Sequence, residues 1–485
     1  MNIAKPAAAA IAVAAIAAAP ADLSAYTEPV YLFETSGTGT NLASTLTVSV
    51  TENGVTTAKS YGEISPTSGT IVKRGTGFLL PDSRLGDFTG EIVVEEGAWL
   101  VTGPGELGKS TYDSKAKVVV TNGGGSVVFD VPPTLDAHFY QNFWLAGDGY
   151  DGLGALCILN MGNPSGSYYT KVFHASTWIL TGDATLCLGD VDAAGTTKVY
   201  TYYQSLYLEG HKLSVRNLEG SSGGRVLSTT YLGLYPKTGG QLDFDGVDFE
   251  LYSPSALQGD SGNVLTFSDP AGKSAWLRLT SGSILIPWTL RLCDAAIYSN
   301  KGVPGTTNVA AWAGPVELLD GRNALDGVNS TSFSFLGPLT GAGGLEVPTA
   351  REISLVGGGS FEGEFVLNSK ATNAEPRTAE GALRVFWPGA LPATSKGATL
   401  YDSDLKLMYG DAYDLPALAF DIAGGMTNSF SGGTNGIVAA LSVRGGGTLD
   451  MTAPLAVTGV TEIAAGSTLR IPCDRAGLNF GWRIQ

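Results

Sequence analysis

Residues 88–108 have the sequence FTGEIVVEEGAWLVTGPGELG, and this stretch decides the expected fold of the chain. FTGEIVV (88–94) and EGAWLV (96–101) are short apolar runs, and the Gly-rich turn GPGELG (103–108) follows them. Apolar runs of this length broken by Gly indicate short strands joined by tight turns, with no space for a helix between them. A weaker copy occurs downstream, with FEGEFVL at 361–367 and EGALRV at 380–385. Such internal repetition predicts a chain built by stacking similar units.

Further short strands of the form Leu-x-apolar follow Gly at residues 185–188, 241–244, 448–451 and 468–471. Leu449 and Leu469 are twenty positions apart. A unit of roughly 20 to 25 residues with three short strands has the size expected of one coil of a parallel β-helix. We therefore predict an all-β chain with a parallel β-helix, a solenoid, over residues 69–485. We expect loops to protrude from it at residues 137–169, 195–203, 298–313 and 368–380.

The composition agrees with this architecture and excludes one class of partner. Gly accounts for 66 of 485 residues, and charged residues make up 15%, where about 25% is typical. Gly supplies turns with positive φ, and low charge suits strands that are largely buried or paired. The formal net charge is −16 and no long basic run offsets it. We expect no binding to nucleic acid, because an acidic surface repels a phosphate backbone.

The N-terminal 68 residues are predicted to contain an export signal and a cap. Lys5, the Ala-rich apolar run 7–19 and the small residues of Ala19-Pro20-Ala21 and Ala25 are typical of a signal peptide, assigned to residues 1–25. A membrane anchor is the alternative, but the run is shorter than the ~20 residues that a span needs. We therefore expect an extracellular or cell-surface protein whose mature chain does not span a membrane.

Residues 26–68 contain the alternating run LASTLTVSVT (42–51), followed by Asn53-Gly54. Alternation of apolar and polar residues predicts a two-faced strand, and Asn-Gly is a strong tight-turn signal. A stack of coils otherwise exposes an unpaired edge at its first coil. We therefore predict that residues 26–68 form a small N-terminal β cap.

The stretch GTGFLL (75–80), together with FTGEIVV, EGAWLV and the following Leu107-Gly108, resembles the autotransporter-associated β-strand repeat of exported bacterial passenger-type proteins. The resemblance is clear over residues 69–108, partial at 336–385 and generic elsewhere. It implies a right-handed parallel β-helix at or beyond the cell surface, with a structural or adhesive role and without catalytic residues or a cofactor. Residues 472–485 are too few for a membrane β-barrel, whose strands need ~10 residues each. We therefore expect a separated passenger, a fragment, or a chain exported by another route.

The cysteines and histidines give no sign of a metal site. No C-x-x-C pair occurs and the three histidines are scattered, which argues against structural zinc, and repeated calcium-binding nonapeptides are absent. Cys157 and Cys187 each lie within an apolar triplet. If they stack on neighbouring coils, about 4.8 Å apart, they form either a disulfide or a pair of buried thiols. We favour buried thiols.

Asp243 and Asp245 form the best candidate for a catalytic carboxylate pair, because residues two apart in a strand point to the same face. Polysaccharide-degrading β-helix enzymes use such pairs, and glycosidic cleavage needs carboxylates about 5 to 9 Å apart. Acidic residues on the outer face of a strand need no function, however, and we expect none here. The phrase Asp411-Ala412-Tyr413-Asp414 and the Ser phrase GDSG (259–262) are weaker signals, since a Gly-rich turn explains the latter equally well.

Tyrosine is abundant, at 19 residues, with Tyr168, Tyr169, Tyr202, Tyr203, Tyr207, Tyr231 and Tyr235 close together in the sequence. Exposed aromatic rings can contact sugars or a partner protein, but stacked Tyr ladders also stabilise sheets, and we favour the ladder. The sequence thus predicts a non-catalytic structural or adhesive passenger, with glycans or a cell-surface protein as partners. A secreted lyase or glycoside hydrolase is the first alternative. A self-associating subunit of an extracellular fibre or layer is the second.

Overall fold

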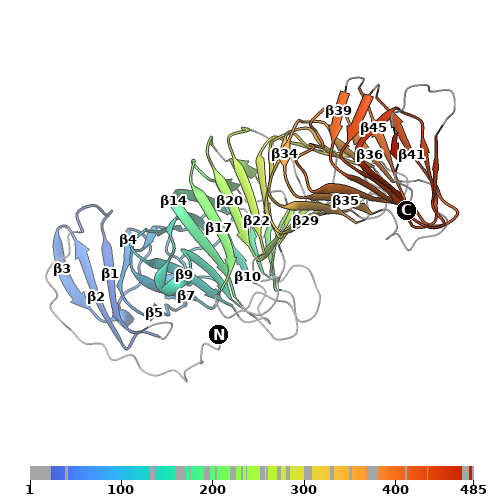
Figure 1. The fold of residues 1–485 in the computed structure, drawn as a ribbon. Coiled ribbons are helices and arrows are strands. Elements are labelled where there is room, and N and C mark those ends of the chain that lie inside the picture. The colour runs from blue at the N-terminus through green and yellow to red at the C-terminus, as the bar shows by residue number, and fades with distance from the viewer. Residues whose placement is uncertain are drawn as a thin grey trace. The chain divides into compact units, whose positions relative to one another are not determined.

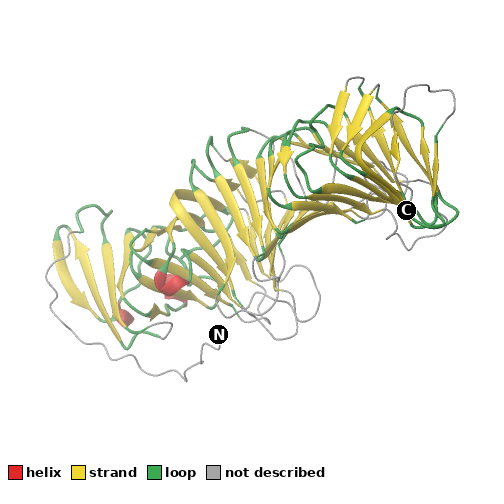
Figure 2. Cartoon of the chain, in the orientation of Figure 1, coloured by secondary structure: helices red, strands yellow, loops and turns green. Residues whose placement is uncertain are grey.

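The computed structural model describes residues 23–38, 42–131, 137–159, 171–174, 176–189, 197–202, 205–218, 225–230, 233–235, 237–251, 257, 260–269, 275–279, 284–299, 309–327, 332–348, 352–368, 381–409, 412–433, 435–471 and 480–482. Strands dominate this part of the chain (Figure 2). Its only regular helical elements are the 3-10 turns η1 (Tyr61–Glu63), η2 (Ser83–Leu85) and η3 (Tyr150–Gly152). The chain divides into two compact units, Met1–Phe249 and Glu250–Gln485. The prediction of an all-β chain is confirmed.

The first unit begins with antiparallel strands (Figure 1), β1 (Val30–Ser36), β2 (Thr45–Glu52) and β3 (Val55–Lys59). β2 pairs antiparallel with both β1 and β3. Asn53 and Gly54 join β2 to β3 with φ angles of 52° and 72°, so the predicted tight turn is confirmed. β1 also pairs in parallel with β4 (Thr70–Gly75), where the antiparallel start meets the parallel part of the unit.

Three parallel ladders follow in the first unit. The first contains β4, β6 (Glu91–Val94), β8 (Lys117–Val120), β11 (Asn142–Gly147), β14 (Thr177–Leu188), β16 (Ser205–Tyr207) and β19 (Gly233–Tyr235). The second contains β5 (Phe78–Leu79), β7 (Gly97–Val101), β9 (Gly125–Asp130), β12 (Leu156–Leu159), the end of β14, β17 (Lys212–Asn217) and β20 (Gln241–Asp245). The third contains β10 (Ala137–Phe139), β13 (Lys171–His174), β15 (Thr197–Tyr202) and β18 (Arg225–Thr230). The unit ends in β21 (Val247–Leu251).

The second unit repeats this arrangement. One sheet has nine strands, β24 (Ile284–Ile286), β27 (Val309–Trp312), β30 (Ser332–Phe335), β33 (Glu352–Leu355), β36 (Gly381–Val385), β38 (Ser403–Leu407), β41 (Thr427–Gly432), β44 (Thr448–Met451) and β46 (Thr468–Arg470). A second ladder contains β23 (Trp276–Leu279), β26 (Ala296–Ser299), β29 (Arg322–Gly327), β32 (Gly344–Val347), β35 (Glu364–Asn368), β37 (Gly397–Tyr401), β40 (Leu418–Asp421), β43 (Leu441–Arg444) and β45 (Leu455–Ile463).

A third ladder of the second unit contains β22 (Val264–Ser268), β25 (Thr289–Cys293), β28 (Val316–Asp320), β31 (Leu339–Gly341) and β34 (Ser360–Phe361). Near the C-terminal end, β39 (Ala412–Leu415) and β42 (Asn435–Val438) pair with each other, β42 pairs with β45, and β45 pairs with β47 (Phe480–Trp482). The strand pairings described in this unit are all parallel, so its sheets are long parallel ladders.

The core of the first unit is built from equivalent side chains on successive strands. Ile71, Ile92, Val118, Phe143 and Trp178 occupy matching register positions in the first ladder, and all are buried. The Phe143 and Trp178 rings meet edge to face, with centroids 6.3 Å apart. Burying a large apolar side chain stabilises a fold by about 1.5–3 kcal/mol, so each strand of the ladder adds to the stability of the unit.

Strand register agrees with the predicted spacing in places and exceeds it in others. Leu449 and Leu469, twenty positions apart, are register partners, as the sequence predicts. Phe143, however, pairs with Trp178, thirty-five positions later, so the spacing between register partners is less uniform than expected. The predicted loop at 137–169 was wrong over β10, β11 and β12, and the loop at 195–203 was wrong over β15. The loop at 298–313 was wrong over the end of β26 and over β27. Residues 160–169, 195–196, 203, 300–308 and 369–380 of the predicted loops lie outside the described part.

Candidate functional site

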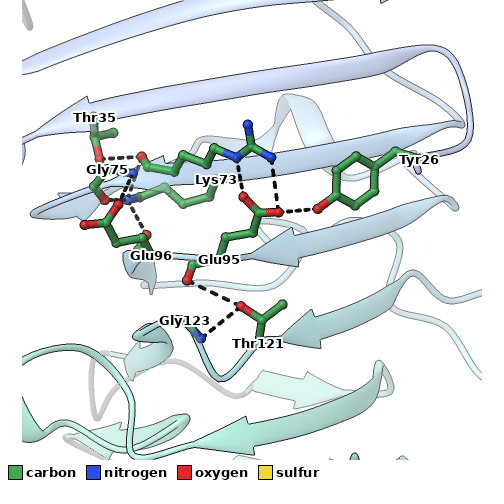
Figure 3. Close-up of polar contacts among 9 residues, drawn as sticks. Tyr26, Thr35, Lys73, Gly75, Glu95, Glu96, Thr121 and Gly123 are labelled. Atoms are coloured by element: carbon green, nitrogen blue, oxygen red, sulfur yellow. Dashed lines mark hydrogen bonds and ion pairs between the residues drawn. The ribbon is translucent and has the colours of Figure 1, made fainter. Parts of the chain in front are cut away.

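Lys73 on β4 is a cation enclosed in the first unit (Figure 3). Its Nζ donates to the carbonyl oxygens of Arg74 at 3.2 Å, Gly75 at 2.5 Å and Glu96 at 2.8 Å. Burial lowers the pKa of Lys73 to about 7, and the Glu96 carboxylate acts in the opposite direction. That carboxylate also accepts the backbone N–H of Gly75 at 3.2 Å. A perturbed pKa marks a candidate active-site residue, so accessibility decides the role of Lys73.

The turn at Gly97 closes the space around the Lys73 amine. Gly97 has a φ of 71°, and a Cβ atom there would lie 2.4 Å from the Gly75 carbonyl oxygen and 2.5 Å from Lys73 Nζ. Gly is therefore required, both for its backbone conformation and for the close approach of neighbouring coils. A general base must reach the proton that it abstracts. Lys73, with 0% of its surface exposed, tethers backbone carbonyls and does not face a substrate.

Arg74, Glu95 and Tyr26 form a second polar cluster beside Lys73 (Figure 3). The Glu95 carboxylate accepts hydrogen bonds from Arg74 Nε and from the Tyr26 hydroxyl. Burial raises the pKa of Glu95, but these two hydrogen bonds outweigh it and hold the pKa below its usual value. Burial, together with Glu95, raises the pKa of Tyr26 to about 12. The cluster fastens the segment before β1 to the strands of the first ladder, and we assign it a structural role.

The candidate carboxylate pair lies on the outer face of β20. Asp243 and Asp245 alternate with the buried Leu242 and Phe244, so both acids point to the same face, as the sequence predicts. Asp243 lies 4.0 Å from the ammonium of Lys212, its near neighbour on β17. Asp245 is exposed, and its register partner is Arg216, which also lies on β17. Each acid of β20 thus lies beside a basic residue of the neighbouring strand β17, an arrangement typical of cross-strand ion pairs.

The weaker catalytic candidates do not form a constellation in the described residues. The Asp260 carboxylate accepts the N–H of Gly262 at 2.8 Å, which makes the Ser phrase a local turn, and Gly259 lies outside the described part. Asp411 is also outside it, whereas Tyr413 is buried on β39 and Asp414 is exposed. The described residues hold no group of three or more His, Cys, Asp or Glu side chains placed to share a metal ion.

Cys157 and Cys187 are register partners on β12 and β14, so the predicted stacking is confirmed. Both are free, buried thiols rather than a disulfide. Burial raises the pKa of both thiols, and Cys187 Sγ contacts the Gly152 carbonyl oxygen at 3.6 Å. A buried, protonated thiol is chemically inert, so the pair acts as core side chains.

The tyrosine ladder is confirmed for one pair. The Tyr207 and Tyr235 rings stack in register, with centroids 4.4 Å apart and an interplanar angle of 11°. Their faces therefore cover each other, and the pair stabilises neighbouring strands. Tyr168, Tyr169, Tyr203 and Tyr231 lie outside the described residues, and nothing is described of the side chain of Tyr202.

The second unit carries an exposed apolar surface where the neighbouring strands β36 and β38 of its nine-stranded sheet end. We call it the aromatic turn surface, and it consists of Phe386, Trp387, Met408 and Tyr409. Trp387 is 54% and Tyr409 53% exposed, which is unusual for such large rings. The two rings stack with centroids 5.3 Å apart, and the ring centroid of Phe386 lies 5.8 Å from that of Tyr409.

Hydrogen bonds to buried groups fix the backbone of the turns that carry these rings. The hydroxyl of buried Tyr413 lies 2.7 Å from the Tyr409 carbonyl oxygen and 2.9 Å from that of Phe386, and it accepts the N–H of Tyr409 at 3.2 Å. The N–H of Phe386 donates to the Leu355 carbonyl at 2.9 Å, which continues the ladder hydrogen bonding into the turn. The backbone of both turns is therefore preorganised, and a ligand that bound there would not have to order it.

Charges beside the aromatic turn surface are paired. Arg384, two residues before Phe386, forms an ion pair with Glu352 at 2.6 Å, and Lys406, two residues before Met408, forms one with Asp404 at 3.5 Å. Sequence reasoning missed this surface, because apolar residues that follow a strand have no alternation to show whether they are exposed. The available signal was the pair of aromatic residues FW at 386–387, directly after the strand EGALRV.

No family model, curated protein or solved structure matches this chain. No helix in the described residues has the length and apolar character needed to cross a membrane.

Proposed function

We propose that this chain is an exported bacterial passenger-type protein, folded as a right-handed parallel β-helix with an N-terminal β cap, that binds a partner without catalysis. Three features support the proposal. The strands pair in parallel with strands one coil away, the antiparallel β1–β2–β3 group precedes the first parallel coil, and the sequence of residues 69–108 resembles the autotransporter-associated repeat.

The observation that carries the binding role is the half-exposed, stacked Trp387–Tyr409 pair, carried on turns whose backbone is hydrogen-bonded. Large exposed aromatic groups on a soluble surface mark binding sites. Trp and Tyr combine an apolar ring with an N–H or O–H group, so they suit ligands with both apolar faces and polar edges. The neighbouring charges are compensated within the chain, which favours an uncharged ligand over an ionic one. We therefore propose a neutral glycan as the ligand.

The geometry of the acidic residues favours binding over hydrolysis. Glycosidic cleavage requires one carboxylic acid with a raised pKa and a second, ionised carboxylate across the scissile bond. Asp243 instead lies beside the Lys212 ammonium, and Asp245 lies opposite Arg216. This arrangement is typical of cross-strand ion pairs on the outer face of a sheet, which need no catalytic role.

A glycan array probed with the wild-type chain and the Trp387→Ala variant tests this proposal. We expect the wild-type chain to bind at least one neutral glycan and Trp387→Ala to lose at least tenfold in affinity. Tyr112→Ala is the matched control, because Tyr112 is 69% exposed and lies in the other unit. Incubation of each bound glycan with the protein should release no reducing ends. Release of reducing ends, or equal binding by Trp387→Ala, contradicts the proposal.

A further inference from the structure

The segment Leu23–Tyr26, just before β1, is part of the folded first unit. Leu23 and Tyr26 pack against an apolar cluster on the outer side of the strands, formed by Val30, Leu32, Val72 and Val93. These four side chains are buried, at 5% exposure or less. On the outer face of a sheet such burial requires a cover, and Leu23 and Tyr26 supply part of it.

Hydrogen bonds fix this cover in position. The Tyr26 N–H donates to the Leu23 carbonyl oxygen at 3.1 Å, which closes a turn over residues 23–26. The Tyr26 hydroxyl donates to the Glu95 carboxylate, which is paired with Arg74 (Figure 3). The segment thus makes apolar contacts with the cluster that includes Val72 of β4 and Val93 of β6, and a polar contact with Glu95 in the turn after β6. We call residues 23–26 the N-terminal latch.

The sequence offers two small-residue positions for removal of an export leader, after Ala21 and after Ala25. Cleavage after Ala21 places Ala19 and Ala21 at the two positions where small residues are preferred. Cleavage after Ala25 would place the larger Leu23 at one of them and would remove three of the four latch residues. It would also convert the Tyr26 N–H, which now donates to Leu23, into a free ammonium group.

We infer that the export leader ends at Ala21, so that the mature chain begins at Asp22 and keeps the N-terminal latch. This inference rests on the proposed export and differs from the leader of residues 1–25 that the sequence alone suggested. The reaction is hydrolysis of the Ala21–Asp22 peptide bond by a leader-cleaving protease. Water adds across the C–N bond, and the products carry a carboxylate on Ala21 and an ammonium on Asp22. The latch is what the mature fold gains from this choice of bond.

Expression of the full chain in a bacterium with a general secretion pathway tests the inference. The exported protein is purified, and its N-terminal residue is determined by intact mass and by N-terminal sequencing. A mature chain that begins at Asp22 supports the inference. A chain that begins at Tyr26 overturns it while leaving export intact. An uncleaved chain retained in the cytoplasm overturns the proposed export, and the inference fails with it.

A second measurement tests the latch without secretion. Chains that begin at Asp22 and at Tyr26 are produced in the cytoplasm and unfolded in urea. The chain from Asp22 should unfold at the higher urea concentration, and Leu23→Ala in that chain should lower its midpoint part of the way towards that of the chain from Tyr26. Lys59→Ala is a matched control, since Lys59 is exposed on β3. Equal midpoints for the two chains would show that the latch adds no stability and would overturn the reason given for cleavage after Ala21.

Discussion

Replacement of Lys73 by Met tests how the buried amine of Lys73 contributes to the stability of the first unit. Met keeps the length of the side chain and removes the amine, so the carbonyl oxygens of Arg74, Gly75 and Glu96 lose a donor. A buried acceptor left without a partner costs about 1–3 kcal/mol. Against this, the wild-type chain bears the cost of burying Lys73, whose pKa falls from 10.5 to about 7. The net effect of Lys73→Met must therefore depend on pH.

The sign of that dependence follows from where the proton is bound. Between pH 7 and 10.5 the unfolded chain holds a proton on Lys73 that the folded chain has released. Stability of the wild-type chain therefore rises with pH through this window, by up to about 1.4 kcal/mol per pH unit. The contribution of Lys73 to this stability is greatest above pH 10.5 and is lost as the pH falls towards 7. Lys73→Met lacks this term, so its destabilisation should grow by about 2 kcal/mol between pH 7 and pH 9.

Urea unfolding of both chains, followed by tryptophan fluorescence at pH 7, 8 and 9, measures the difference directly. Other titrating groups are common to the two chains and cancel. A pH-independent difference would refute the reasoning. It would show that the three carbonyl oxygens, which match the three N–H bonds of an ammonium, keep Lys73 charged when buried.

Three further outcomes follow from other sites. Gly97→Ala should destabilise the chain by more than 2 kcal/mol, whereas Gly124→Ala, with a similar φ but no atom within 4 Å of the added Cβ, should cost about 1 kcal/mol in urea unfolding. Asn428→Val should raise the free energy of unfolding by about 1–2 kcal/mol, since the Asn428 amide is buried without a hydrogen bond, and a lower value would contradict this. Cys157 and Cys187 should react with a thiol reagent only in denaturant, because both are buried with raised pKa values, and fast labelling of the folded chain would disprove their placement.

Local sequence signals predicted the strands and turns that depend on neighbouring residues. Asn53-Gly54 forms its tight turn because both residues tolerate positive φ. Leu449 and Leu469 become register partners because the chain between them has the length of one coil. Cys157 and Cys187 stack for the same reason, each within an apolar strand.

Features that depend on distant segments could not be predicted in this way. Residues 137–169 are rich in Gly, Asn and Tyr, which suggested a loop, yet Phe143 and Leu145 alternate with Trp144 and form an inward-facing strand. The tether at Lys73 requires Glu96 one coil later, and no local pattern pairs them. Exposure of Trp387 depends on which neighbouring coils leave it uncovered, and this is a property of the packed unit alone.

The central claim is that equivalent strands lie side by side in parallel, one coil apart. Nitroxide labels at Thr448→Cys and Thr468→Cys, in a chain with Cys293 and Cys473 replaced by Ser, test it directly because these threonines are register partners on β44 and β46. The account predicts strong dipolar broadening of the electron paramagnetic resonance spectrum for this pair, and none for Thr448 paired with Thr289→Cys. Unbroadened spectra for the Thr448–Thr468 pair would contradict it.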